Sequence, residues 1–199
     1  RSHAGVVIRN GLVYAGFAAG KLAAISLKNG AVVWESSVSQ PRGNTELERI
    51  SDITSLPALD NSRVCAVAFQ GRLACFDPVQ GGALWTRDVS SDKGLEMFGK
   101  TLYLTDADSN VLALDMAGGA SLWKNDQLLA RGVTAPYPLG DHLLLGDFEG
   151  YLHVLKSDDG SIVARRATDG TAIRIAPVTL GDGALVMTRG GMLYSVGIR

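Results

Sequence analysis

Long apolar runs are missing from this chain of 199 residues, although 46% of its residues are hydrophobic. A membrane-spanning helix needs about 20 consecutive apolar residues, and glycine or a charged residue interrupts every apolar run well before that length. The opening RSHAGVVIRN also has neither the apolar core nor the small-residue cleavage site of a signal peptide. We therefore expect no membrane span and no export signal in this stretch.

An excess of one charge sign is missing too. The chain has 19 Lys and Arg against 20 Asp and Glu, a net charge of -1, and no run of like charges. Binding to nucleic acid or to anionic lipid depends on clustered positive charge. The composition therefore predicts an ordinary folded chain with a buried core and no nucleic-acid partner.

Cysteine is scarce, with two residues, Cys65 and Cys75. They flank a predicted hairpin turn at Gln70 and Gly71, so we expect their strands to be neighbours. A cross-strand disulfide needs Cα and Cβ distances that few register positions supply. The alternative is a pair of small buried apolar residues; the sequence favours it, leaves the disulfide open and does not decide the redox compartment.

A repeat of about forty residues organises the chain. In one unit its landmarks are Pro57, Gly71, Leu73, Gly81 and Trp85. All or part of the same spacing recurs at Gly20, Leu22, Gly30 and Trp34, at Val111, Gly119 and Trp123, at Pro136, Gly150, Leu152, Gly160 and Ala164, and at Pro177, Gly191 and Leu193. The chain therefore contains five related units.

Each unit reads as four short strands joined by tight turns. The middle strands are apolar on both faces, since in LACF Leu73 and Cys75 point one way and Ala74 and Phe76 the other. Sheets buried on both sides pack face to face around an axis, so we predict an all-β β-propeller of four-stranded antiparallel blades in one domain, residues 1–199. The predicted blades are 4–38, 54–89, 93–125, 133–167 and a three-stranded fifth at 174–199.

The tryptophans Trp34, Trp85 and Trp123 occupy the same place in three units. We predict that each lies on the outermost strand of its blade and covers the junction with the next blade. A residue repeated in this way serves packing rather than ligand binding.

One connection is too long. The hairpin positions recur every 38 to 41 residues, but Gly20 and Gly71 are 51 apart, which predicts an insertion between blades at residues 36–53. It should emerge on the face that carries the hairpins between middle strands. We expect that face to be acidic, because its hairpins contain Asp106, Asp108, Asp147 and Glu149.

The insertion, RGNTELERISDI at 42–53, has two interpretations. Thr45 and Glu48 can form a capping box for one helical turn that places Leu47 and Ile50 on one side. A charged, partly apolar loop on a rigid scaffold is a common place for function. The alternative is a solvated linker with Glu46 and Arg49 paired.

Catalytic chemistry has little support in the sequence. His3, His142 and His153 are scattered, without the spacing of a zinc site, and His153 is expected to be a packed or rim residue of a strand. The segment TDADSNV lacks the glycine and the closing glutamate of a calcium loop, so we interpret it as a hairpin with acidic caps. We expect no catalytic, cofactor or metal residues.

Three stretches now support a resemblance. NVLALDMAGGASLW resembles the pyrroloquinoline-quinone-like propeller repeat, and NTELERISDI at 44–53 with GDFEGYLHVL at 146–155 is similar to the BamB family of outer-membrane β-barrel assembly lipoproteins. The resemblance covers the whole chain and maps it to the C-terminal half of such a protein. It implies an eight-bladed ring that begins with a lipidated cysteine.

The resemblance also implies a function. A BamB-like protein would be a non-enzymatic scaffold on the periplasmic side of the outer membrane that binds the POTRA domains of BamA, with unfolded outer-membrane proteins as a second class of partner. Arg1 and Asp52 match the family's contact positions, and Ser51 precedes Asp52 as the motif requires. Thr54 stands where some relatives carry a second Asp. The expected contact set is Arg1, Arg42, Glu46, Leu47, Glu48, Arg49, Ile50 and Asp52.

Other functions remain open. A fragment of a quinone-dependent dehydrogenase shares the repeat, although resemblance to those enzymes calls for adjacent cysteines, which Cys65 and Cys75 are not. A glycan-binding propeller is contradicted by no residue. With an incomplete fifth blade, the isolated chain is also expected to expose apolar end faces and to self-associate.

Overall fold

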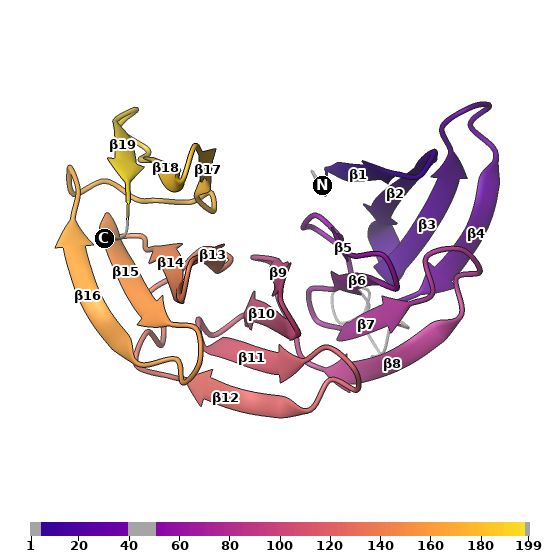
Figure 1. Ribbon diagram of the computed structural model, residues 1–199, viewed down its shortest axis with the longest axis horizontal. Coiled ribbons are helices and arrows are strands. Elements are labelled where there is room, and N and C mark those ends of the chain that lie inside the picture. The colour runs from indigo at the N-terminus through magenta and orange to yellow at the C-terminus, as the bar shows by residue number, and fades with distance from the viewer. Residues whose placement is uncertain (1–4, 40–50, 198–199) are drawn as a thin grey trace.

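Five antiparallel sheets lie side by side along an open arc (Figure 1). The computed structural model describes residues 5–39 and 51–197. Blade 1 consists of β1 (Val6–Arg9), β2 (Leu12–Phe17), β3 (Lys21–Ser26) and β4 (Val32–Ser37), and blade 2 of β5 (Ala58–Leu59), β6 (Val64–Val67), β7 (Arg72–Phe76) and β8 (Ala83–Asp88).

The remaining blades follow the same order. Blade 3 contains β9 (Leu95–Phe98), β10 (Thr101–Thr105), β11 (Val111–Asp115) and β12 (Ser121–Asn125), and blade 4 contains β13 (Tyr137–Leu139), β14 (His142–Gly146), β15 (Tyr151–Lys156) and β16 (Ile162–Ala167). Blade 5 has three strands in the described chain, β17 (Val178–Leu180), β18 (Gly183–Met187) and β19 (Leu193–Val196). The predicted fold class is confirmed, whereas the size of the complete ring stays a prediction.

Helix is almost absent from the described residues. The 3-10 turn η1 (Ala18–Gly20) lies in the hairpin between β2 and β3. Within residues 5–39 and 51–197, no helix has the length and apolar character to cross a bilayer.

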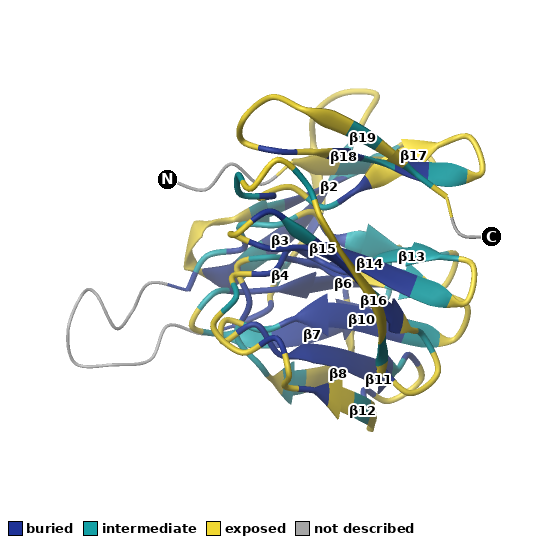
Figure 2. Cartoon of the chain, turned by 90° about the vertical axis from the view of Figure 1, so that its left-hand side faces the viewer, coloured by how far each residue is buried: buried dark blue, intermediate teal, exposed yellow. Residues whose placement is uncertain are grey.

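The core is divided among the spaces between blades. Leu73 and Cys75 face the core shared by blades 2 and 3, whereas Ala74 and Phe76 face the core shared by blades 1 and 2. This alternation confirms the prediction that middle strands are buried on both faces. Figure 2 shows the same division, with buried middle strands and exposed outer strands and loops.

The repeated tryptophans join each blade to the next. Trp34 lies on β4, and its indole Nε1 donates to the carbonyl of Pro78 in blade 2 at 3.0 Å. Its ring covers Gly81, where an added Cβ would come within 2.6 Å of the indole. The same arrangement recurs for Trp85 with Met116 and Gly119, and for Trp123 with Ser157 and Gly160. The predicted position and packing role of these residues are therefore confirmed.

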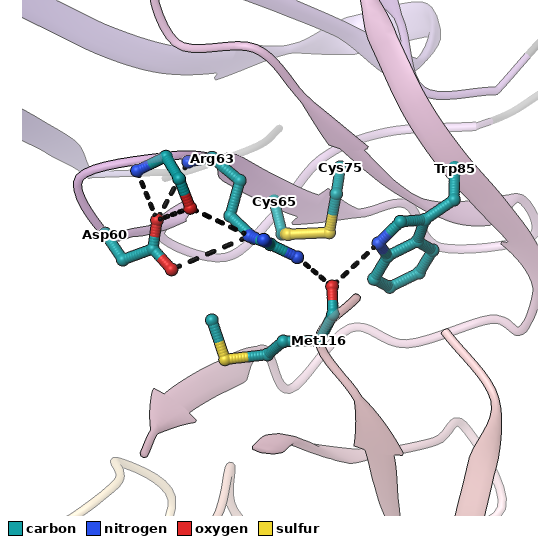
Figure 3. The surroundings of a disulfide bond; sticks show 7 residues. Asp60, Arg63, Cys65, Cys75, Trp85 and Met116 are labelled. Atoms are coloured by element: carbon teal, nitrogen blue, oxygen red, sulfur yellow. Dashed lines mark hydrogen bonds and ion pairs between the residues drawn. A yellow bond between two sulfur atoms is a disulfide. The ribbon is translucent and has the colours of Figure 1, made fainter. Parts of the chain in front are cut away.

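The two cysteines are bonded, which corrects the preference for unpaired residues (Figure 3). Cys65 on β6 is the direct register partner of Cys75 on β7, because the hairpin is centred on Gln70, and their Cα atoms are 4.0 Å apart. Gln70 has a φ of +52°, as the predicted turn requires. Both cysteines are fully buried, as expected.

The disulfide lies beside the contact between blades 2 and 3. There Arg63 and Trp85 both donate to the carbonyl of Met116, and Asp60 accepts from the backbone N–H of Arg63 at 2.8 Å (Figure 3). The Met116 side chain belongs to the same core as the two sulfurs. The bond therefore joins two strands of one blade next to an interblade hydrogen-bond cluster.

Candidate functional site on the hairpin face

The connectors between blades emerge beside the hairpins that join the two middle strands. We call this side the hairpin face, and it contains the hairpins at residues 18–20, 68–71, 106–110, 147–150 and 188–192. In four junctions the N–H of a hairpin residue donates to the carbonyl of a connector residue 17 positions earlier, at 2.8 to 3.2 Å. The pairs are Phe69 with Asp52, Ala107 with Ser90, Phe148 with Arg131, and Arg189 with Ala172. Four connector residues therefore occupy equivalent positions in the repeat: Asp52, Ser90, Arg131 and Ala172.

Asp52 links the hairpins of blades 1 and 2. Its side-chain Oδ1 accepts from the N–H of Ala19 at 3.0 Å, and its carbonyl accepts from the N–H of Phe69 at 2.9 Å. The next residue, Ile53, is fully buried, and its N–H donates to the carbonyl of Phe17 at 3.3 Å. This places the end of the insertion on the predicted face and holds the half-buried Asp52 carboxylate at the surface there.

A hollow of about 310 Å³ lies beside this position. We call it the blade 1–2 hollow, and its lining residues are Ser37, Val38, Ser39, Gln70, Gly71, Arg72, Thr86 and Asp88. Arg72 Nε and Asp88 Oδ1 form an ion pair at 2.6 Å on its rim. Gly71 lines the hollow and packs closely against its neighbours, because a Cβ there would lie 2.7 Å from Ser51 Oγ and 2.8 Å from the Cβ of Ser39.

Ser51 contributes an unused polar atom to this region. Its side chain is 2% exposed, and its Oγ has no hydrogen-bond partner among the described residues. A buried hydroxyl without a partner costs free energy. The region around Gly71 therefore combines a hollow, the buried Ser51 hydroxyl and the Asp52 carboxylate.

At the equivalent connector position between blades 3 and 4, the side chain of Arg131 contacts the hairpin of blade 4. Arg131 donates from Nε to Asp147 Oδ2 at 2.7 Å and from Nη2 to Glu149 at 2.5 Å. Asp147 is fully buried; its Oδ2 also meets His153 Nε2 at 2.8 Å, and its Oδ1 accepts from the N–H groups of Glu149 and Tyr151. This carboxylate therefore organises the whole hairpin.

Burial and hydrogen bonding set the protonation states of this pair. Burial by itself raises the pKa of Asp147, but hydrogen bonds from His153, the Tyr151 N–H and Arg131 outweigh it, and the pKa falls below its ordinary value. Burial lowers the pKa of His153, against the opposing effect of Asp147. A neutral His153 whose Nε2–H donates to an ionised Asp147 fits these directions, and Nδ1 then has no partner in the part of the chain that the structure describes.

The predicted contact residues can now be placed. Seven of them lie outside the described residues: Arg1, Arg42, Glu46, Leu47, Glu48, Arg49 and Ile50. The predicted capping box at Thr45 and Glu48 lies outside them as well. Asp52 is described and lies where the hairpins of blades 1 and 2 meet. Of the predicted acidic hairpin residues, Asp147 is a correction, because it is buried against Arg131 and His153 and presents no charge to the surface.

Other predictions about single residues are confirmed. His153 is packed inside the sheet, at 1% exposure. Asp106 caps the TDADSNV hairpin by accepting from the N–H groups of Asp108 and Asn110. The sequence reasoning missed Arg131, although counting 17 residues back from each hairpin would have aligned it with Asp52.

Comparison with known proteins places this architecture in a family. The family model described as outer membrane protein assembly factor BamB matches residues 1–125. The outer membrane protein assembly factor BamB of Burkholderia pseudomallei is 45% identical over 182 residues, which cover 92% of this chain and 48% of that protein. The crystal structure of BamB from Moraxella catarrhalis superimposes with a TM-score of 0.89 at 27% identity, covering 97% of this chain and 58% of that one.

Likeness to enzymes is limited to the fold. The quinohemoprotein alcohol dehydrogenase from Comamonas testosteroni superimposes with a TM-score of 0.66 at 14% identity, covering 94% of this chain and 40% of that one. In the described part of the chain, His, Cys, Asp and Glu side chains form no group of three or more that could hold a metal ion.

The blades, their tryptophan contacts and the repeat define a β-propeller of the pyrroloquinoline-quinone-like repeat class. Within that class, the chain belongs to the BamB family of outer membrane protein assembly factors. It spans about half the length of the curated relatives it matches.

Proposed function

We propose that the protein is a non-catalytic scaffold subunit of the machinery that assembles β-barrel proteins in the outer membrane. On this proposal it acts on the periplasmic side, as part of a lipid-anchored parent protein, and docks the POTRA domains of BamA. Unfolded outer-membrane proteins are a second class of partner. Membership of the BamB family supports the assembly role, and the buried Cys65–Cys75 disulfide agrees with an oxidising compartment such as the periplasm.

The observation that carries the docking proposal is the position of Asp52 beside the blade 1–2 hollow. Asp52 is held by Ala19 and Phe69 on the hairpin face, and the insertion that the sequence singled out ends there. A carboxylate held on a rigid scaffold can accept charge-assisted hydrogen bonds from Arg or Lys of a partner. The hollow beside it has room for a partner's side chain or loop.

Capture of purified POTRA repeats by the immobilised protein tests this proposal. We expect Asp52→Arg to weaken binding about 30-fold, which corresponds to about 2 kcal/mol for a charge pair at an interface. Asp52→Asn separates charge from structure, because its amide oxygen can still accept from Ala19. We expect an intermediate loss for this variant.

The matched control is Asp158→Arg. Asp158 is an exposed aspartate in the turn between β15 and β16, at the end of the blade opposite the hairpin face. The substitution Asp158→Arg therefore makes the same change of charge as Asp52→Arg, but away from the proposed site. Equal capture by wild type and Asp52→Arg, or an equal loss with Asp158→Arg, would refute docking at this site.

No described residue cluster favours the dehydrogenase alternative, and its structural neighbours share the fold alone. The glycan-binding alternative likewise has no specific observation in its favour. The scaffold role is therefore the function that we propose.

A further inference from the structure

A second surface of distinctive chemistry lies at the hairpin-face end of the two outer strands of blade 4, β15 and β16. Tyr151 on β15 is half-buried, and two guanidinium groups lie near its ring. The Cζ of Arg165 is 4.7 Å from the ring centroid, and that of Arg131 is 5.7 Å. We call these three residues the blade 4 platform.

Ion pairs and hydrogen bonds hold Arg131 and Tyr151 in place. Arg131 is fixed by Asp147 and Glu149, and the N–H of Tyr151 donates to Asp147 Oδ1 at 2.8 Å. Arg165 lies on β16 opposite His153, the buried partner of Asp147. An aromatic ring and two guanidinium groups are therefore positioned before any partner arrives, which lowers the entropic cost of binding.

The two arginines of the platform differ in how many carboxylate partners they have. Arg131 has two carboxylate partners, whereas exposed Arg165 has none among the described residues. The Arg165 guanidinium lies over the Tyr151 ring, and its N–H groups have no acceptor among the described residues. A planar guanidinium in this state matches a carboxylate in a two-bond geometry.

The other blades do not repeat this arrangement. Cross-strand pairing identifies the residues equivalent to Arg165 as Glu35 opposite Ala23, Thr86 opposite Ala74, and Lys124 opposite Leu112. The residues equivalent to Tyr151 are Lys21, Arg72 and Asn110. The Tyr–Arg combination is therefore particular to blade 4 in the described chain, and a common need of every blade does not explain it.

We infer that the blade 4 platform binds an acidic segment of a protein partner, whose carboxylate is received by Arg165 and whose chain packs against Tyr151. Tyr and Arg are the residues most enriched at the energetic centres of protein interfaces. A bilayer is a poorer match, because anionic membranes are bound by clusters of several unpaired basic residues, and the charge of Arg131 is already neutralised. This surface is separate from the proposed docking site at Asp52.

Binding of a fluorescein-labelled hexaglutamate peptide at low ionic strength tests the inference by fluorescence anisotropy. We expect saturable binding to the wild-type protein and a loss of about tenfold in affinity for Arg165→Glu. Arg165→Lys keeps the charge but not the planar stack, and Tyr151→Leu removes the ring. Both should weaken binding by about two- to fivefold.

The matched control is Lys124→Glu, which makes the same change of charge at the equivalent exposed position of blade 3. It should leave hexaglutamate binding within about twofold of wild type, apart from weak long-range screening. Asp52→Arg should leave it similarly unaffected, which separates this inference from the docking proposal. Thermal unfolding confirms that each variant is folded, and Arg165→Gln replaces Arg165→Glu if the latter is not.

Three outcomes would overturn the inference. The first is absence of hexaglutamate binding to the wild-type protein. The second is an equal loss of hexaglutamate affinity with Lys124→Glu. This would show that the peptide responds to positive charge anywhere on the outer strands, where charged residues also serve to prevent edge-to-edge pairing of strands. The third is tighter binding to phosphatidylglycerol vesicles with the same dependence on Arg165, which would assign the platform to a membrane surface.

Discussion

The junction between blades 1 and 2 and the junction between blades 3 and 4 are built from the same repeat, yet they differ in what fills them. At the first, small residues around Gly71 leave a hollow with an exposed Arg72–Asp88 pair on its rim. At the second, Tyr151, Arg165 and Arg131 occupy the equivalent positions over a buried Asp147. The difference teaches that the strands and interblade contacts fix the scaffold, while a few connector and hairpin positions decide whether a junction is open or filled.

The largest expected effect lies in the filled junction. Asp147→Ala removes the acceptor for Arg131, His153 and two backbone N–H groups, so we expect a loss of about 3 kcal/mol or more in the free energy of unfolding. Denaturant unfolding measures it. Asp88→Ala is the control at the open junction, and it should cost less than about 1 kcal/mol because the Asp88 side chain is 81% exposed. Similar losses for the two variants would contradict the distinction between the junctions.

The open junction should be sensitive to added volume. Gly71→Ala places a methyl group against Ser51, Ala68 and Ser39 at 2.7 to 2.8 Å, so we expect a loss of about 1 to 3 kcal/mol in the free energy of unfolding. Gly82→Ala, in the same blade, meets no atom within 4 Å and should change stability little. Urea unfolding of both variants measures the difference. Equal stability would show that the hollow can rearrange freely.

The smallest expected effect is a pH dependence of the free energy of unfolding, which arises from His153 at the junction between blades 3 and 4. The pKa of His153 is lowered in the folded state from 6.5, so the unfolded chain binds more protons below that value. Stability should therefore be fully present above about pH 6.5 and should fall as the pH is lowered from there toward the folded pKa, by at most about 1.4 kcal/mol per pH unit.

Denaturant unfolding at several pH values, for wild type and His153→Gln, measures this dependence. The variant lacks the titrating group, so its curve should be flatter below about pH 6.5. Asp147 acts in a separate window, because its pKa is lowered from 3.8 and its contribution is lost as the pH falls through the still lower folded value. Identical pH curves for the two proteins would refute the assignment to His153.

The sequence predicted the scaffold well because its determinants are local and repeated. The spacing of Gly81 and Trp34, Gly119 and Trp85, or Gly160 and Trp123 reflects a contact that the first three junctions share. The alternation of Leu73, Cys75, Ala74 and Phe76 likewise reports two buried faces. Such features need no knowledge of distant residues.

The contents of the junctions were harder to predict because they depend on residues far apart in the chain. Asp147 reads as one more acidic hairpin residue until Arg131, 16 positions earlier, and His153 are seen beside it. The sequence favoured unpaired cysteines because the disulfide depends on the strand register, which the turn at Gln70 determines. The resemblance to the BamB family singled out Asp52 within the insertion that the break in the repeat marks, whereas its contacts with Ala19 and Phe69 become visible in the structure alone.

The recurring backbone bond from hairpin to connector has a consequence for how such proteins diversify. Asp52 is anchored to the next blade by the same bond that anchors Ser90, Arg131 and Ala172, whatever the length of chain that precedes each of them. Residues can therefore be gained or lost upstream of the anchor without disturbing the geometry of either neighbouring blade. Related proteins can therefore lengthen one connector between blades and gain a new binding specificity while the propeller scaffold stays unchanged.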